Sequence, residues 1–503
     1  MTDNPMITPG ADRSTPTLAA LLDGLLARVP PDLADRRVTG LTLDSRGVEP
    51  GDVFVALAGG SRHGLEFAGQ ALEAGAAAVV YDPESETPEI PGARDEAVVP
   101  VPGLAGRLHH LARAFWGDPS RALRLHGITG TNGKSSCAWL IAQATGGAMV
   151  GTLGAGRPGS LMPLEHTTPD LFTLYRLLAG FAAEQMGDVA LEVSSHALDQ
   201  GRVAGLSFET VVFTNLGEDH RDYHRQPESY GRAKSRLFSD YPARRALISA
   251  DDDFGRRIIR DYDGPGELWA WTLEDAPDAR LCARIRSASA DGMELELTTP
   301  AGVIEFHSGL LGGFNAANLL ITAGVLTGLG RSTGEVVGCL TGLEPVPGRM
   351  NRLPGRAGQP DVVIDYAHSP DALEAVLAAL APLCRGQLWC VFGCGGERDR
   401  EKRPRMGAVA ERVAHRIILT DDNPRAENGL SIIREIQSGM ARPDRARVIR
   451  DRASAIETAM TEAGDADLVL VAGKGHETSQ EIDGQRRAFS DFEVVSRVRE
   501  AAA

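Results

Sequence analysis

Hydrophobic and polar positions repeat along the chain with two periods. Apolar residues recur at helical spacing over residues 17–26, whereas residues 38–60 alternate apolar and polar positions between glycine and proline turns, as strands do. From residue 124 onward, short β-rich runs alternate with helical stretches such as residues 315–329. This rhythm is typical of βαβ units on a parallel sheet, so the pattern predicts an α/β fold.

A segment dense in glycine and proline, residues 342–361, separates this rhythm from a second βαβ series. In that second series we expect a helix over 370–383 and strands over 362–368, 388–393, 416–422 and 467–473. At about 150 residues per domain, the length suggests three domains. We predict a small N-terminal α/β domain (1–108), a central P-loop ATPase-like domain with a parallel sheet (109–345) and a C-terminal Rossmann-like domain (346–503).

Composition and charge narrow the class of protein. Hydrophobic residues make up 43% of the chain and charged residues 24%, as in folded proteins, and no apolar run approaches the roughly 20 residues that cross a bilayer. Residues 1–16 lack a basic segment followed by an apolar one, so they predict a loose tail and no secretory signal. Six scattered cysteines form no disulfide framework, which favours a reducing cytoplasm. A net charge of −16 disfavours nucleic acid as a partner.

A phosphate-binding loop is predicted where a short apolar strand meets a helical segment. The sequence there, residues 127–136, reads GITGTNGKSS. Gly130 and Gly133 let backbone N–H groups turn toward phosphates, Lys134 reaches the terminal phosphates, and Ser135 can place Mg²⁺. Ile128 stands where the common P-loop pattern has its first glycine, so this is a variant of that loop. A simple surface turn is less consistent with the coincidence of strand, loop, Lys-Ser pair and helix.

Acidic and histidine side chains follow two later predicted strands. Glu192 and His220 stand at strand ends, which face the ligand crevice of an open parallel sheet. Mg²⁺ prefers oxygen ligands, which makes Glu192 a natural ligand and His220 an unusual one. Considered alone, Glu192 would be solvated, His220 would pack or hydrogen-bond, and Lys234 would be an exposed helix lysine.

The sequence GTNGKSS resembles the ATP loop of the Mur ligases and of folylpolyglutamate synthetase, and the resemblance extends over nearly the whole chain. In that superfamily ATP phosphorylates a carboxylate, and an amine then attacks the acyl phosphate. The resemblance implies that Glu192 and His220 surround magnesium ions and that Lys234 carries a carbamate beside the second Mg²⁺. Ser135, Glu192, His220 and carbamylated Lys234 are thus the implied metal-site residues, and Lys134, Glu192, His220 and Lys234 the implied catalytic ones.

The resemblance also implies the contacts of two nucleotides. For ATP these are Asn315 and Asn318, Arg349, Asp365, His368 and the loop residues Gly130, Thr131, Asn132, Gly133, Lys134, Ser135 and Ser136. For a UDP-sugar peptide they are Leu43, Ser45, Gly60, Ser61, Arg62, Thr167, Thr168, Ser194, Gln200 and Arg202. Individually, each of these could be a turn, cap or solvated residue.

The C-terminal block carries the features that distinguish one ligase from another. By resemblance, residues 420–427, TDDNPRAE, match members that add meso-diaminopimelate. That amino acid has an extra carboxylate, which Arg425 can bind with two charge-assisted bonds. The implied amino-acid contacts are Arg398, Asp422, Asn423, Pro424, Arg425, Gly473 and Glu477. Arg400, Lys402 and Arg403 belong to a charge run that alone predicts a solvated face.

The resemblance implies ATP-dependent ligation of meso-diaminopimelate to UDP-N-acetylmuramoyl-L-alanyl-D-glutamate with Mg²⁺ as cofactor, and we expect a cytoplasmic, monomeric enzyme. Three alternatives stay open at this point. The chain could be a lysine-adding relative, a folylpolyglutamate synthetase-like ligase, or a P-loop nucleotide switch that hydrolyses ATP without an acceptor.

Overall fold

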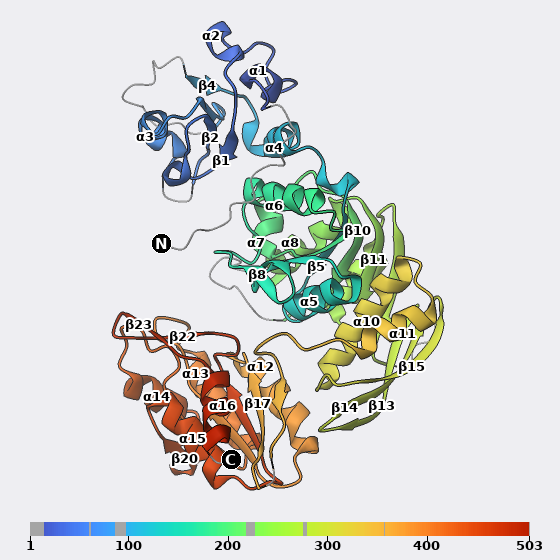
Figure 1. Ribbon diagram of the computed structural model, residues 1–503, viewed down its shortest axis with the longest axis vertical. Coiled ribbons are helices and arrows are strands. Elements are labelled where there is room, and N and C mark those ends of the chain that lie inside the picture. The colour runs from blue at the N-terminus through green and yellow to red at the C-terminus, as the bar shows by residue number, and fades with distance from the viewer. Residues whose placement is uncertain are drawn as a thin grey trace. The chain divides into compact units, whose positions relative to one another are not determined.

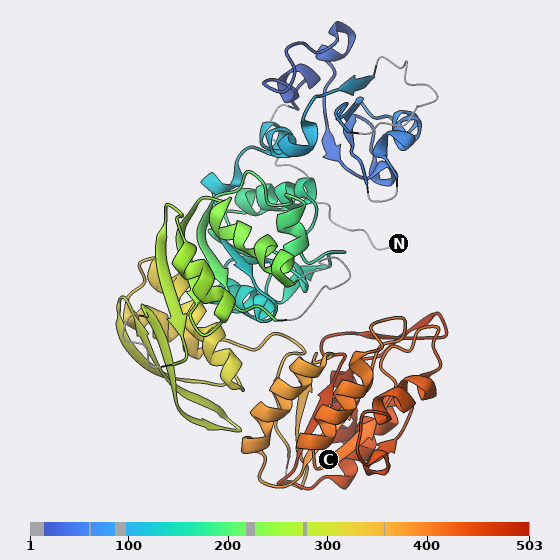
Figure 2. The ribbon, with the colours of Figure 1, turned by 180° about the vertical axis from the view of Figure 1, so that it is seen from behind.

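The computed structural model describes residues 15–59, 62–85, 97–217, 227–274, 279–356 and 358–501 (Figures 1 and 2). These residues form two compact units. The first contains the described residues up to 272 with 279–280 and 324–328, and the second contains 273–274, 281–323 and the described residues from 329. Most of the predicted N-terminal tail lies outside the described residues. The predicted domain boundaries at 108/109 and 345/346 stay predictions.

The first unit begins with a small four-stranded parallel sheet in the order β1-β2-β3-β4. Its elements are α1 (Leu18–Leu21), α2 (Pro31–Ala34), β1 (Gly40–Thr42), β2 (Asp52–Ala56), α3 (Ala68–Glu73), β3 (Ala78–Tyr81) and β4 (Val98–Pro100). The helix predicted over 17–26 is shorter than expected. Thr17 caps its start, but Gly24 adopts a φ of +74°, a left-handed conformation that ends the helical path.

A larger parallel sheet follows in the same unit, with strand order β12-β11-β10-β5-β9-β6 and the antiparallel hairpin β7-β8 beside β6. Its elements are α4 (Leu108–Trp116), β5 (Arg124–Thr129), α5 (Lys134–Thr145), β6 (Ala148–Gly151), β7 (Gly154–Arg157), β8 (Ser160–Met162), α6 (Leu171–Ala183), β9 (Asp188–Glu192), α7 (Ser195–Asp199), β10 (Phe208–Phe213), α8 (Pro227–Ser239), β11 (Ala243–Ser249), α9 (Asp253–Asp261) and β12 (Glu267–Thr272). The register pairs Ile128 with Glu192 and Thr129 with Phe213. The carboxyl ends of β5, β9 and β10 therefore meet at one edge, as predicted for a parallel sheet.

Asp188 gives the first unit a pH-dependent stability. Its buried carboxylate accepts hydrogen bonds from Arg124 (2.8 and 2.6 Å) and faces Nε2 of buried His126 at 3.1 Å. Burial alone would raise the pKa of Asp188, but these hydrogen bonds outweigh it and lower the pKa from 3.8 to about 2. The carboxylate thus stabilises the folded state above pH 4, and this contribution is lost as the pH falls from about 4 toward 2.

We expect Asp188→Asn to remove about 2 kcal/mol of pH-dependent unfolding free energy at neutral pH. Urea unfolding of both proteins between pH 2 and 7 would test this. The parent should lose stability relative to the variant as the medium becomes acidic. Parallel pH curves for the two proteins would contradict the assignment.

The second unit contains an antiparallel meander and a six-stranded sheet with order β16-β17-β21-β18-β19-β20. Its elements are β13 (Leu281–Ser289), β14 (Gly292–Thr299), β15 (Gly302–Ser308), α10 (Gly313–Gly328), α11 (Thr333–Thr341), β16 (Asn351–Leu353), β17 (Asp361–Asp365), α12 (Pro370–Leu380), β18 (Leu388–Phe392), α13 (Lys402–Val413), β19 (Arg416–Leu419), α14 (Gly429–Gln437), β20 (Ala446–Val448), α15 (Arg452–Glu462), β21 (Leu468–Ala472), β22 (Ser479–Ile482), β23 (Gln485–Ala488) and α16 (Asp491–Ala501). The meander β13–β15 corrects the expectation of an uninterrupted parallel rhythm in the middle of the chain.

The six-stranded sheet is covered on both faces. Val363 belongs to the apolar cluster shared with α12, α13 and α14, whereas its neighbours Val362 and Ile364 belong to the cluster shared with α15 and α16. Successive strand residues point to opposite faces, so a strand buried on both sides reads as a continuous apolar run. This explains why β17, β18, β19 and β21 were predictable, whereas the more exposed edge strands β16 and β20 were not predicted. Within the described ranges, no helix combines the length and apolarity needed to cross a membrane.

Candidate active site

The predicted phosphate loop joins β5 to α5 in the first unit. Gly130 and Gly133 have φ values of +148° and +87°, and a Cβ at Gly130 would lie 1.8 Å from Thr214 Oγ1, so only glycine fits there. Lys134 begins α5, and its ammonium donates to the carbonyls of Gly130 and Thr131, both at 2.9 Å. The two glycines therefore determine the shape of the loop, with Lys134 and the N-terminus of α5 beside it.

Glu192 ends β9 next to this loop and is fully buried. Its Oε2 accepts a hydrogen bond from Ser135 Oγ at 2.9 Å, and its Oε1 accepts one from the backbone N–H of Thr152 at 2.9 Å. A Cβ at Gly151 would lie 2.1 Å from Glu192 Oε1, so the last residue of β6 must be glycine. The structure therefore brings the predicted pair Glu192 and Ser135 together. His220 lies outside the described residues.

Lys234 lies on α8 and is only 1% exposed, so the expectation of an exposed helix lysine was wrong. Its ammonium donates to the Gly130 carbonyl at 2.7 Å and lies 4.3 Å from the Tyr230 ring centroid. Lys134 donates to the same carbonyl oxygen. Two ammonium groups therefore meet at one carbonyl oxygen, and each raises the free-energy cost of the positive charge on the other.

The predicted sugar-nucleotide residues of the central sheet connect to Glu192. Thr168 Oγ1 donates to the Glu192 carbonyl at 2.7 Å and accepts from the Ser194 N–H at 3.1 Å. Arg202 donates to the Thr168 carbonyl at 2.7 Å and to Gln200 Oε1 at 2.7 and 3.0 Å. Thr167 lies 3.0 Å from Thr152, with hydroxyl facing hydroxyl. A chain of hydrogen bonds thus runs from Arg202 to Glu192.

A cleft of about 1740 Å³ in the first unit collects most of the remaining predicted sugar-nucleotide residues. Its lining contains Leu43, Ser45, Arg62, Gln200 and Arg202. Residues of the small sheet and of the central sheet therefore share one cavity. Thr167, Thr168 and Ser194 are not part of its lining, and Gly60 and Ser61 lie outside the described residues.

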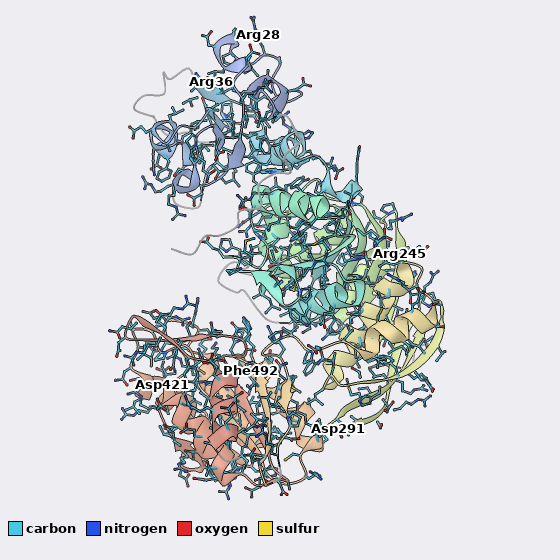
Figure 3. The ribbon with its side chains drawn as sticks, viewed as in Figure 1. Arg28, Arg36, Arg245, Asp291, Asp421 and Phe492 are labelled. Carbon is cyan, nitrogen blue, oxygen red and sulfur yellow. The ribbon has the colours of Figure 1, made fainter. Side chains whose placement is uncertain are left out.

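In the second unit, the predicted amino-acid residues gather at the ends of β19 and β21. Asn423 Nδ2 donates to Glu477 Oε2 at 2.8 Å, and a Cβ at Gly473 would lie 2.4 Å from Asp422 Oδ2. Burial raises the pKa of Asp422. The neighbouring Asp421, labelled in Figure 3, pairs instead with Arg450 at 2.8 Å.

The turn after β19 holds Arg425 in an unusual backbone conformation. Its φ is +53°, and its side chain donates to the Gly396 carbonyl at 2.6 Å. A Cβ at Gly395 would lie 3.2 Å from Arg425 Nη1 and 3.8 Å from Arg398 Cγ, so the two arginines flank this glycine. The structure therefore brings Arg398 and Arg425 together, as the sequence predicted.

The predicted ATP residues of the second unit form two groups. On α10, Asn315 and Asn318 are buried and bonded to each other at 2.9 Å. The second group surrounds Tyr366, which follows β17. The guanidinium of Arg349 lies 5.0 Å from the Tyr366 ring centroid, and His368 Nδ1 lies 2.8 Å from the Tyr366 carbonyl. Asp365 accepts backbone hydrogen bonds at 2.8 and 2.7 Å, and burial raises its pKa. Asp365 thus fixes the backbone on which Arg349 and His368 are carried.

Family models match three successive parts of the chain. They are described as Mur ligase family, catalytic domain (residues 37–116), Mur ligase middle domain (128–326) and Mur ligase, glutamate ligase domain (348–475). The chain is 47% identical over 468 residues to the UDP-N-acetylmuramoyl-L-alanyl-D-glutamate–2,6-diaminopimelate ligase of Pseudomonas aeruginosa, which covers 92% of this chain and 95% of that one. The chain belongs to the Mur ligase family.

Further comparisons agree with this assignment. The enzyme of the same name from Xylella fastidiosa is 45% identical over 94% of this Mur ligase and 97% of its own length. A solved structure of a UDP-N-acetylmuramoyl-L-alanyl-D-glutamate–2,6-diaminopimelate ligase superposes with a TM-score of 0.71 at 33% identity, covering 96% of this chain and 99% of that one. The predicted α/β architecture is thereby confirmed, with N-terminal, middle and C-terminal Mur ligase domains. This Mur ligase uses ATP to form an amide bond, so the nucleotide-switch alternative was wrong.

Sequence reasoning missed several residues of this Mur ligase. Arg403, expected on a solvated face, is fully buried and pairs with Glu427 at 2.9 Å and Glu435 at 2.7 Å. Its Nη2 also donates to the Gly395 carbonyl at 3.1 Å, so it supports the glycine beside Arg425. Arg176 on α6 lines the cleft of the first unit. Neither residue stands in a recognisable motif, and only the fold reveals its position.

Proposed function

We propose that this ligase joins meso-diaminopimelate to UDP-N-acetylmuramoyl-L-alanyl-D-glutamate, with hydrolysis of ATP to ADP and phosphate. The observation that carries the proposal is the amino-acid site in the second unit. Arg425 and Arg398 supply positive charge, and Asp422 and Glu477 supply negative charge, so opposite charges of a zwitterion meet opposite partners. The similar enzymes of Pseudomonas and Xylella carry this activity in their names. We further propose a cytoplasmic monomer.

The proposed reaction has two steps. A carboxylate oxygen of the D-glutamyl residue attacks the γ-phosphorus of ATP, the bond to the bridging oxygen breaks, and ADP leaves. The amine of diaminopimelate then attacks the acyl carbon, inorganic phosphate leaves, and the amine loses a proton as the amide forms. Lys134 and the loop N–H groups stabilise the charge that develops on the transferred phosphoryl group. No residue is assigned as an obligatory general base.

The residues beside the phosphate loop fit Mg²⁺ because they supply hard oxygen donors. Glu192 is buried with Ser135 Oγ at 2.9 Å, and a carbamate on Lys234 would add a second anion. Bound Mg²⁺ would screen the repulsion between a carboxylate and a triphosphate. We propose Ser135, Glu192, His220 and carbamylated Lys234 as its holders. Among the described residues alone, no three His, Cys, Asp or Glu side chains cluster at metal-binding distance.

The cleft of the first unit is the proposed site of the sugar nucleotide. Its guanidinium, hydroxyl and amide groups suit a diphosphate and a peptide carboxylate. The hydrogen-bond chain from Arg202 through Thr168 to Glu192 connects this cleft to the phosphate loop. We propose Leu43, Ser45, Gly60, Ser61, Arg62, Thr167, Thr168, Ser194, Gln200 and Arg202 as contacts of the sugar peptide. For ATP we propose the loop residues 130–136 with Asn315, Arg349, Asp365 and His368.

Arg425→Lys should weaken binding of meso-diaminopimelate more than any other substrate. Lysine keeps the charge but cannot make two parallel bonds to a carboxylate, and one charge-assisted bond is worth about 1.5–3 kcal/mol. We therefore expect the KM for diaminopimelate to rise about 10- to 100-fold. Steady-state kinetics with each substrate varied in turn would measure it. Arg416→Lys, an exposed arginine bonded to Gln387, is the matched control. An unchanged KM in the Arg425 variant would contradict the assignment.

A coupled phosphate-release assay tests the proposed function itself. Phosphate should appear only when ATP, the UDP-sugar dipeptide and meso-diaminopimelate are all present. Turnover with L-lysine but none with diaminopimelate would replace the proposed specificity by that of a lysine-adding ligase. Turnover with a folate acceptor in place of the sugar dipeptide would overturn the proposal.

A further inference from the structure

A buried lysine lies behind the amino-acid site of the second unit. Lys474 follows β21 and is 0% exposed. Its ammonium donates to Glu477 Oε2 at 2.8 Å and to Asn423 Oδ1 at 3.2 Å. Both partners are proposed contacts of the amino acid, whereas Lys474 itself has no assigned role. A buried ammonium costs free energy unless it is paired, so its retention at this point needs a reason.

The composition makes Lys474 more conspicuous. Only four of the 52 lysine and arginine residues in the chain are lysine. Lys134 and Lys234 are two of them, and both donate to the carbonyl of Gly130 in the phosphate loop. An arginine spreads its donors over a plane, whereas an ammonium is a compact point that can bridge two acceptors in a confined space. At position 474 the ammonium places a compact charge between Glu477 Oε2 and Asn423 Oδ1.

The hydrogen bonds of Lys474 determine which atoms remain for a ligand. Asn423 Oδ1 also accepts the Glu481 N–H at 3.0 Å, and its Nδ2 donates to Glu477 Oε2. Both bonds that Glu477 receives end on Oε2, and within the described part of the chain its Oε1 receives none. The amide of Asn423 is thus held in one orientation, and Glu477 Oε1 is the atom available to an incoming ammonium.

The hydrogen bonds from Lys474 and Asn423 dominate the electrostatics of Glu477. Burial alone would raise its pKa, but the bonds from Lys474 and Asn423 outweigh this and lower the pKa, with a smaller contribution from His476. The carboxylate also has coulombic interactions with Tyr366, Asp422 and Arg452. Among the described residues, the cation that donates a hydrogen bond to Glu477 is Lys474. Glu477 is therefore kept ionised and aimed by Lys474.

We propose that Lys474 is a positioning residue for the amino-acid substrate. It fixes the Glu477 carboxylate and the Asn423 amide so that Glu477 Oε1 binds the distal ammonium of the incoming zwitterionic amino acid. Lys474 acts through these two residues and does not touch the substrate. This inference rests on the proposed function, because it concerns the same site.

The test is the effect of Lys474→Met on each substrate separately. The KM for meso-diaminopimelate should rise about 10- to 100-fold, the range expected for loss of one charge-assisted contact, while the KM values for ATP and the sugar dipeptide stay within about twofold. Lys474→Arg, which keeps the charge but moves it from the bridging point, should show the same pattern more weakly. It also serves as the test variant if the methionine protein does not fold by circular dichroism.

A double-mutant cycle with Glu477→Gln separates positioning from general destabilisation. If Lys474 acts through Glu477, the double variant should bind diaminopimelate no more weakly than Glu477→Gln alone. Additive effects, an equal rise of all three KM values, or an unchanged KM for diaminopimelate would overturn the proposal. Arg447→Met, which removes an exposed cation paired with Glu462, is the matched control in the same unit.

Failure of the proposed function is recognised independently of this test. If the parent enzyme ligates a different amino acid, the specificity proposal fails, and the same KM comparison is made with the amino acid that the parent uses. If the parent uses diaminopimelate and the Lys474 variants show no selective KM effect, only the positioning proposal fails.

Discussion

Lys134→Met should reduce kcat by about a hundred- to a thousandfold while leaving the fold intact. Lys134 begins α5 and donates to two loop carbonyls, so its ammonium lies in the loop that we propose binds the phosphates of ATP. The γ-phosphate is already anionic in the ground state, but its charge is redistributed in the transition state, and an ammonium placed for that distribution should affect kcat more than the KM for ATP. Phosphate release under saturating substrates would measure the loss.

The matched variant for this prediction is Lys134→Arg. It keeps a cation at the same position, so it should retain more activity than the methionine variant. Circular dichroism spectra should be the same for all three proteins. A methionine variant with near-normal kcat would show that the loop binds ATP without assistance from Lys134, and the proposed role would then be wrong.

Lys234→Arg should reduce kcat nearly as much as Lys134→Met does, although arginine is positively charged like an unmodified lysine. Lys234 and Lys134 donate to the same Gly130 carbonyl, at 2.7 and 2.9 Å. A carbamate on Lys234 would turn the repulsion between two cations into attraction and supply an anion near Glu192. Arginine cannot form that carbamate, so we expect a fall in kcat of about a hundredfold or more.

The carbamate itself can be observed. The enzyme equilibrated with ¹³C-labelled bicarbonate should show a carbamate carbon signal by NMR, and the signal should be absent from Lys234→Arg. Depletion of carbon dioxide should lower the activity of the parent enzyme but leave the residual activity of the variant unchanged. A fully active arginine variant would exclude a catalytic carbamate.

Short-range patterns predicted the site residues that stand in motifs. Residue types and spacing predicted the Gly130–Ser135 loop directly, whereas the roles expected for Glu192 and for the turn at Arg425 came from the resemblance to the Mur ligases. The two-sided burial of strands such as β17 made the inner strands of the six-stranded sheet equally readable. The meander β13–β15 was missed although β14 and β15 alternate buried and exposed positions; most of β13 is exposed, so its own pattern does not indicate a strand.

Burial of charged residues was the other feature that the sequence did not predict. Arg403 looks like part of a solvated charge run, yet its partners Glu427 and Glu435 lie more than twenty positions away. Lys234 looks like an ordinary helix lysine until α8 is placed beneath the loop. Such pairings depend on tertiary packing, and no local period encodes them. The scarcity of lysine in the composition was the one signal that could have drawn attention to Lys234 and Lys474.

The positive φ of Arg425 has a consequence for laboratory evolution. A non-glycine residue at +53° carries about 1 kcal/mol of conformational strain that glycine would relieve. Glycine would also delete the guanidinium that donates to the Gly396 carbonyl and that we propose binds the second carboxylate of the amino acid. Because glycine also gains freedom in the unfolded chain and loses the hydrogen bond to Gly396, relief of this strain would give Arg425→Gly no net gain in heat tolerance, while the proposed discrimination between amino acids would be lost. Any thermostabilisation campaign should hold this position constant.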